Sequence, residues 1–161
     1  MATNYEFFAK TWGNEAKTFV SVIRALPGDR LDYKPHERSA AAGDLAWQLA
    51  LQATSLGPIL ETGVVDFDAY QRPGSIEAIA DAFDTAAKRV SELMAGVDDA
   101  KWASKADFRM GGQSVWSASV ESMCWGNLLD MIHHRGQLSS YIRPMGGKVP
   151  SIYGPSADSE G

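Results

Sequence analysis

The segment DMIHHRGQLSSY, residues 130–141, gives the clearest indication of the fold and of a functional site. As part of a helix, it continues a polar stripe whose members lie three or four residues apart: Met123, Asn127, Asp130, His134, Gln137 and Tyr141. A neighbouring stripe is apolar and predicts a buried face: Val120, Cys124, Leu128, Met131, Leu138 and Ile142. Because buried polar groups are costly without partners, a polar stripe beside an apolar one predicts a site inside a helical bundle.

Three further segments repeat apolar residues at helical spacing. The first starts at an expected N-cap, Asn4, and ends at the break 27–29; the second opens at 43–44, with Asp44 as its expected N-cap, and ends at 62–63. The third follows Ser75 and stops at Gly96. The fourth helix, which contains the opening segment, is expected from near Val115 to Arg143, where Pro144 follows.

Between these helices, residues 64–74 are expected to form a loop, and residues 106–113 an extended or hairpin-like connection. The sequence therefore predicts an all-α protein, an antiparallel four-helix bundle with a long crossover connection. A length of 161 residues fits one domain, residues 1–161, with a mobile tail from about residue 155.

Composition excludes several classes of protein. The formal net charge is −5, which disfavours nucleic acid as a partner because such a surface needs clustered Lys and Arg. No apolar run approaches the length of a membrane span, and residues 1–6 do not resemble a signal peptide. The single cysteine, Cys124, fits a reducing cytoplasm, and its place on the apolar stripe predicts a buried, unreactive thiol. We therefore expect a cytoplasmic protein that acts on a small molecule.

Two blocks of sequence resemble a known family. The block HHRGQLSSYIRPMGGKVPSIYG, residues 133–154, is similar to the C-terminal signature of the DinB-like (damage-inducible protein B) family, and DYKPHERSAAAGDLAWQLA, residues 32–50, is similar to its second-helix entry. The resemblance covers nearly the whole chain. It implies a four-helix bundle, a homodimer, and a divalent metal held by three histidines. Carried onto this sequence, those ligand positions fall on Gln48, Asp130 and His134.

Only one of the three implied ligands is a histidine here. Asp130 and His134 are four residues apart, so they share a helix face and can share one ion, whereas the neutral amide of Gln48 is a weaker ligand. This donor set shifts preference from zinc and nickel towards manganese, magnesium or iron(II). The alternative is a metal-free network, in which Asp130 accepts from His134 and Gln48 completes the hydrogen bonds.

Four other residues are candidate substrate contacts. His36 lies in the loop before the second helix, Trp47 adjoins Gln48, and Gln137 and Tyr141 continue the polar stripe. Each also has a purely structural interpretation: a solvated loop histidine, a packed aromatic, or an anchor for the tail. Arg135 lies off the polar stripe and is expected to form a salt bridge on the flank of the bundle.

Two functions remain open. The resemblance implies a metal-dependent enzyme, a thiol-dependent transferase or a hydrolase, which uses manganese, iron, nickel or zinc and a low-molecular-weight thiol. The alternative is a non-catalytic, dimeric small-molecule-binding protein whose site has lost its metal. The Gln and Asp at two ligand positions favour the alternative, and the sequence identifies no substrate.

Overall fold

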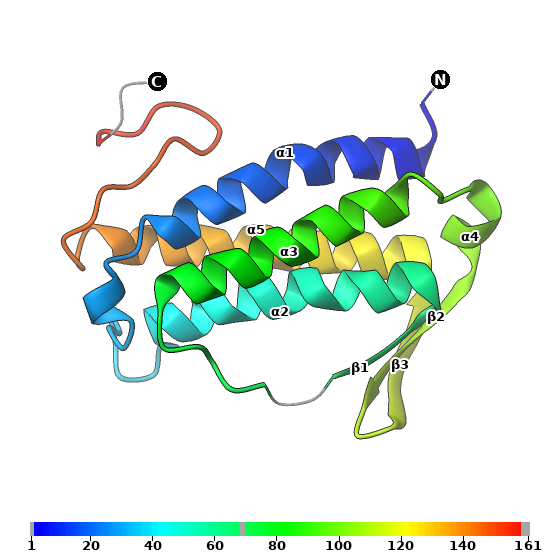
Figure 1. Ribbon diagram of the computed structural model, residues 1–161, viewed down its shortest axis with the longest axis horizontal. Coiled ribbons are helices and arrows are strands. Elements are labelled where there is room, and N and C mark those ends of the chain that lie inside the picture. The colour runs from blue at the N-terminus through cyan, green and yellow to red at the C-terminus, as the bar shows by residue number, and fades with distance from the viewer. Residues whose placement is uncertain (1, 68–69, 159–161) are drawn as a thin grey trace.

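The computed structural model describes residues 2–67 and 70–158. Within these ranges the chain is mostly helical, with long helices α1 (Asn4–Arg24), α2 (Ala42–Glu61), α3 (Ile76–Met94) and α5 (Val120–Ile142). A one-turn 3-10 helix, η1 (Gly28–Arg30), and a short helix, α4 (Asp99–Ala103), lie in the connections. Helix α1 packs against α3 and α5, and α2 packs against the same two helices, so the four long helices lie side by side (Figure 1).

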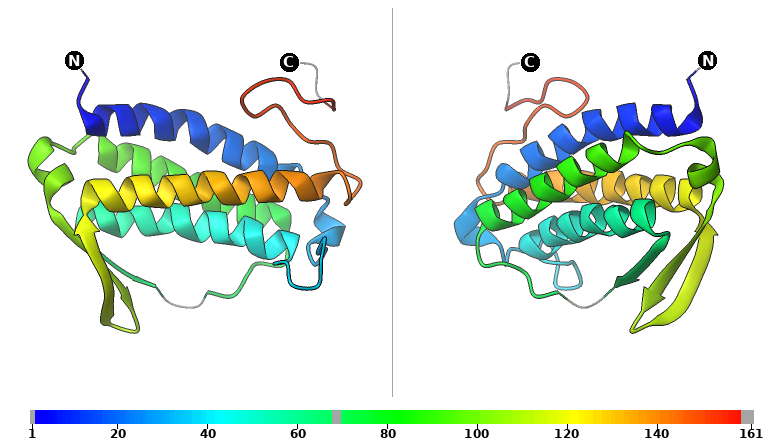
Figure 2. Two further views of the ribbon diagram at one scale, coloured as in Figure 1. Left: turned by 180° about the vertical axis from the view of Figure 1, so that it is seen from behind. Right: turned by 45° about the vertical axis from the view of Figure 1, so that its right-hand side comes forward.

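The expected all-α class is confirmed only in part: the described residues are mostly helical, but they also form a small three-stranded sheet of order β1-β2-β3. Strand β1 (Val64–Phe67) is parallel to β2 (Lys105–Met110), which is antiparallel to β3 (Gln113–Ser119). The sheet projects from one end of the helices on the side of α2, and residues 70–75 run beneath α2 to α3 (Figure 2).

The hairpin between β2 and β3 explains one wrong helix boundary. Gly111 and Gly112 both have positive φ, 58° and 76°, which is the conformation that a two-residue hairpin turn requires. The segment that begins at Val115, expected to be helical, therefore continues as β3. Helix α5 begins only at Val120, with Ser119 as its N-cap accepting a hydrogen bond from the Ser122 amide.

Residues 64–67, expected to lie in a loop, form β1 because they pair with a strand some forty residues further along the chain. Two helix caps also differ from expectation. The N-cap of α1 is Thr3, which forms a capping box with Glu6, and α2 starts after Ala41, which has no side-chain cap. The expected cap at Ser75 is confirmed, since its side chain accepts from the Ala78 amide.

The expected apolar stripe of the last helix is confirmed. All six of its members are buried: Val120, Cys124, Leu128, Met131, Leu138 and Ile142. They pack into a single core with the apolar faces of α1, α2 and α3. None of the helices in the described ranges is both long and apolar enough to cross a membrane.

Candidate functional site

A cavity of about 820 Å³ lies between α2, α5 and the sheet. Its volume is within the range of small-molecule sites, roughly 300–1,000 Å³. The helices contribute most of its polar side chains and the sheet side contributes aromatic ones. The lining residues with apolar side chains include Trp47, Leu51, Ile59, Phe67, Tyr70, Phe108, Met110, Trp116 and Met123.

The aromatic wall arises from the alternation of side chains along the strands. Phe108 and Met110 are two residues apart on β2 and share the face towards the cavity, and Trp116 is the register partner of Phe108 on β3. Phe67 of β1 stacks on Phe108, with ring centroids 6.3 Å apart. Tyr70 meets the Phe67 ring edge-on, at 6.4 Å. Phe67, Tyr70 and Phe108 therefore form one connected aromatic surface, and strand pairing places Trp116 beside it.

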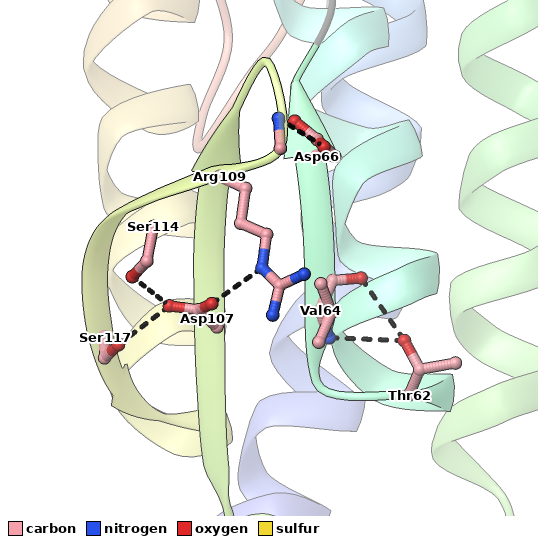
Figure 3. Close-up of polar contacts among 8 residues, drawn as sticks. Thr62, Val64, Asp66, Asp107, Arg109, Ser114 and Ser117 are labelled. Carbon is pink, nitrogen blue, oxygen red and sulfur yellow. Dashed lines mark hydrogen bonds and ion pairs between the residues drawn. The ribbon is translucent and has the colours of Figure 1, made fainter.

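A polar network on the sheet stabilises the strand pairing behind this wall (Figure 3). Asp107 accepts hydrogen bonds from Ser114 Oγ at 2.5 Å, Arg109 Nε at 2.7 Å and Ser117 Oγ at 2.8 Å. These donors, the Ser114 hydroxyl foremost, lower the pKa of Asp107 to about 2. At the turn, the Gly112 amide donates to Asp66 of β1 over 2.8 Å. The contacts hold β1 and β3 to either side of β2.

The polar end of the cavity contains the three residues expected to hold a metal. Gln48 of α2 reaches across to α5, where its Nε2 lies 2.8 Å from His134 Nε2. The same histidine nitrogen is 3.2 Å from Asp130 Oδ2. Gln48 and Asp130 line the cavity, whereas His134 is not part of its lining. The structure therefore brings all three side chains together.

Neighbouring amides determine how this cluster is hydrogen-bonded. His134 Nδ1 lies 2.9 Å from Gln137 Oε1, which can only accept, so Nδ1 carries the proton. In a neutral ring, Nε2 then accepts from the Gln48 amide. Gln52 Nε2 donates to Asp130 Oδ2 over 2.5 Å, and this leaves Gln52 Oε1 buried with no partner among the described residues. A reversed Gln52 amide would place its oxygen against the carboxylate, which is unfavourable.

We tested whether these residues fit a divalent metal. Ligand bonds of about 2.0–2.2 Å place neighbouring ligand atoms about 3 Å apart, and the His134–Asp130 separation of 3.2 Å agrees with this. Gln48, however, presents its N–H to the histidine, and Asp130 already accepts from Gln52. The set fits a metal only if the Gln48 amide turns over to present Oε1. No group of three or more His, Cys, Asp or Glu side chains suited to a metal occurs within the described ranges.

The four expected substrate contacts lie in different places. Trp47 lines the cavity. Gln137 orients His134 through the hydrogen bond described above but is not part of the lining. His36 is exposed in its loop, where Nδ1 accepts from the Arg38 amide. Tyr141 is buried, with its hydroxyl donating to the Ala40 carbonyl over 3.4 Å. The structure therefore does not bring His36 or Tyr141 to the cavity.

Several lining residues were not anticipated. Gln52 lies one turn after Gln48 and therefore on the same face of α2, so helical spacing alone would have identified it. Asn127, on the predicted polar stripe, donates to Ser55 Oγ and to the Gln52 carbonyl, both over 3.0 Å. The sheet aromatics had no comparable signal, because their position depends on strand pairing.

Arg135 was expected to lie on the flank of the bundle, but it lies in the interior, where its side chain is 2% exposed. It forms an ion pair with Glu15 of α1 and donates to Thr18 and to the Tyr153 hydroxyl. Cys124 is buried as expected, and burial raises the pKa of its thiol to about 12. Neither group lines the cavity.

Comparison with known proteins identifies relatives along the whole chain. Residues 1–160 match the model of the DinB family. The uncharacterized protein YrdA of Bacillus subtilis (strain 168) is 26% identical over 163 residues, which cover 98% of this chain and 93% of YrdA. The crystal structure of a DinB-like protein from Bacillus cereus ATCC 10987 superposes with a TM-score of 0.72 at 21% identity, covering 91% of this chain and 95% of that one. The DinB-like protein YjoA of Bacillus subtilis gives 0.67 at 13% identity, with 95% and 99% covered.

Proposed function

Since the chain belongs to the DinB family, we propose that the cavity between α2, α5 and the sheet binds a small, largely apolar molecule. The observation that supports this function is the asymmetry of the cavity: an aromatic wall on one side and a compact polar cluster on the other. Ligand sites in proteins combine an apolar lining with a few convergent polar groups in this way. The polar cluster orients the ligand, and the aromatic wall provides most of the buried surface.

Two glycines of α5 allow a sharp test. Gly126 lines the cavity, and a Cβ added there would meet no atom within 4 Å, so Gly126→Leu should fill part of the cavity without disturbing the fold. Gly136 lies on the same helix, also has no atom within 4 Å of an added Cβ, and does not line the cavity. Gly136→Leu is therefore the matched control, since both changes replace a helix-interior glycine.

Binding of a neutral aromatic alcohol, phenethyl alcohol, should be followed by tryptophan fluorescence, because Trp47 and Trp116 line the cavity. We expect saturable binding that Gly126→Leu weakens by at least about ten-fold and Gly136→Leu leaves unchanged; overpacking of a filled site typically has effects of this order. Equal binding by wild type and Gly126→Leu, or no binding at all, would contradict the proposal.

A second candidate is a metal-dependent enzyme, a thiol-dependent transferase or a hydrolase. The convergence of Gln48, Asp130 and His134 on one point favours it. With the Gln48 amide turned over, one imidazole nitrogen and two oxygens would face a common centre, a set that suits manganese or iron(II) better than zinc or nickel. A bound metal would stabilise the thiolate of a low-molecular-weight thiol at neutral pH.

Metal analysis of protein purified without an affinity tag separates the two candidates. Stoichiometric manganese, iron, nickel or zinc that is lost in Asp130→Ala would establish the metal site. If the protein is metal-free and none of these ions raises its Tm, the enzyme candidate fails and only the binding function remains.

The same preparation tests the proposed homodimer. The exposed Phe7 of α1 and Leu129 of α5 offer apolar surface for it. Light scattering at micromolar concentration should report twice the mass of the chain.

A further inference from the structure

We propose that the ligand of this cavity is an organic cation, an aromatic or alkyl ammonium compound whose charged nitrogen lies between Asp130 and the aromatic wall. The inference rests on the proposed function, because it assigns a ligand class to the same cavity. It follows from the charges, the unpaired acceptors and the aromatic rings that line the space.

The balance of charge in the cavity favours a cation. The charged residues in the lining are Asp44, Arg72 and Asp130. Arg72 is paired twice, with Asp44 at 3.0 Å and with Asp32 at 2.7 Å, so it has no excess charge to offer an anion. Asp130 has no Lys or Arg partner within the described part of the chain. One uncompensated carboxylate therefore faces the cavity.

The side chains that contact Asp130 are an amide and an imidazole, and no Lys or Arg of the described residues pairs with it. Gln52 donates to its Oδ2 but is uncharged. His134 Nε2 lies 3.2 Å from the same oxygen and is shared with Gln48, whose Nε2 is 2.8 Å away. The other carboxylate oxygen, Oδ1, has no hydrogen bond to any described residue, and the Asp130 side chain is 52% exposed. This oxygen is open to a ligand.

The unsatisfied atoms at this end of the cavity are both acceptors. Besides Asp130 Oδ1, the buried Oε1 of Gln52 lacks a partner among the described residues. A ligand that covers this end with an apolar group would leave the carboxylate desolvated and unpaired, which is costly. A carboxylate or phosphate ligand would add repulsion. An ammonium group, with up to three donors and a positive charge, matches the open Oδ1 of Asp130.

The opposite wall suits the same ligand. Trp47, Phe67, Tyr70, Phe108 and Trp116 surround the cavity with aromatic rings, and a cation is attracted to the face of such rings. The rings also accept the apolar body that a primary or substituted amine carries. A net charge of −5 on the whole chain favours the approach of cations over anions.

Three probes of one shape test the ligand class: phenethylamine, phenethyl alcohol and phenylacetate, titrated by tryptophan fluorescence and calorimetry at neutral pH. We expect the amine to bind at least about five-fold more tightly than the alcohol, and the alcohol more tightly than the carboxylate. The advantage of the amine should shrink as salt is added.

Asp130→Asn should remove most of the advantage of the amine over the alcohol, because it removes the charge and keeps the shape; only the attraction of the aromatic rings for the cation remains. Asp99→Asn, an exposed carboxylate on α4 outside the cavity, removes the same unit of charge and should leave the five-fold difference intact. If Asp130→Asn fails to fold, the ranking of the three probes on wild type and its salt dependence still decide.

The outcomes separate the two proposals. If the alcohol binds as tightly as the amine, or phenylacetate binds best, the ligand class is wrong and the binding cavity stands. If no probe binds, both proposals fail.

Discussion

Removing the charge of Glu15 should destabilise the protein far more than breaking an ion pair on its surface. Glu15 is 8% exposed and pairs with Arg135, which is 2% exposed, between α1 and α5. In Glu15→Gln the guanidinium keeps Thr18, the Tyr153 hydroxyl and the face of Phe19, but it loses its counter-charge in the core. Breaking a buried pair costs about 3–5 kcal/mol, and for a chain of this size that lowers the Tm by about 10 °C.

Urea denaturation followed by circular dichroism measures this difference, with Arg89→Met as the matched control. Arg89 pairs with Glu61 between α3 and α2, but its side chain is 52% exposed, so the loss should be within about 1 kcal/mol. The double variant Glu15→Leu with Arg135→Met should be more stable than Glu15→Gln, because no charge remains buried. If Glu15→Gln and Arg89→Met cost the same, or if the double variant is the least stable, burial does not determine the strength of this pair.

Three further predictions concern the tail, the sheet and the metal question. Tyr153→Phe should lower the free energy of unfolding by about 1–2 kcal/mol and speed proteolysis of residues 149–158, because the Tyr153 hydroxyl is hydrogen-bonded to both Glu15 and Arg135. Burial is the main cause that raises the pKa of Tyr153, so the hydroxyl stabilises the fold fully below pH 10.0 and loses this effect at more alkaline pH. Tyr153→Phe should not show this alkaline loss of stability. Asp107→Asn should destabilise the hairpin at neutral pH. Because the pKa of Asp107 is lowered from 3.8 to about 2, its carboxylate stabilises the fold fully above pH 3.8 and loses this effect as the pH falls to about 2. The difference in the free energy of unfolding between the variant and the wild type, measured by urea denaturation, should therefore disappear over this pH range. Gln48→His should raise the affinity for zinc or cobalt, measured by competition with a chelator. The increase should exceed the roughly 10- to 100-fold change seen when residues that only hydrogen-bond to metal ligands are replaced. An unchanged affinity would show that the cluster is not a metal site.

The helices and the pairing of Asp130 with His134 were predictable because both depend on local spacing. The polar and apolar stripes of α5 are offset by one residue. Helical geometry places them on neighbouring faces of the helix, regardless of which other helices pack against it. Gln48 was placed opposite them by resemblance, and the structure puts its amide 2.8 Å from His134. The occupant of the cluster was not predictable, because one amide, one carboxylate and one imidazole can be satisfied with or without a metal.

The sheet was not predictable in the same way. Strand β1 is four residues long and pairs in parallel with a strand that follows α3 and α4, so its stability comes from a distant partner and not from its own sequence. The segment QSVWSAS of β3 alternates weakly, and its residues are largely exposed. The hairpin-like connection at residues 106–113 was expected, and β2 and β3 form it, but the pairing of β1 with β2 was missed, and with it the aromatic wall.

The buried ion pair, by contrast, was present in the sequence as a conflict between residue type and position. Arg135 falls three or four residues from Met131 and Leu138, so the apolar face of α5 includes it. Glu15 falls in the same way between Trp12 and Phe19 on α1. A charge at a core position requires a partner, and two opposite charges at the core positions of two helices supply each other's. If either helix shifted by one turn, each charge would lose its counter-charge, so the pair also fixes the register of α1 against α5, the helix that carries Asp130 and His134.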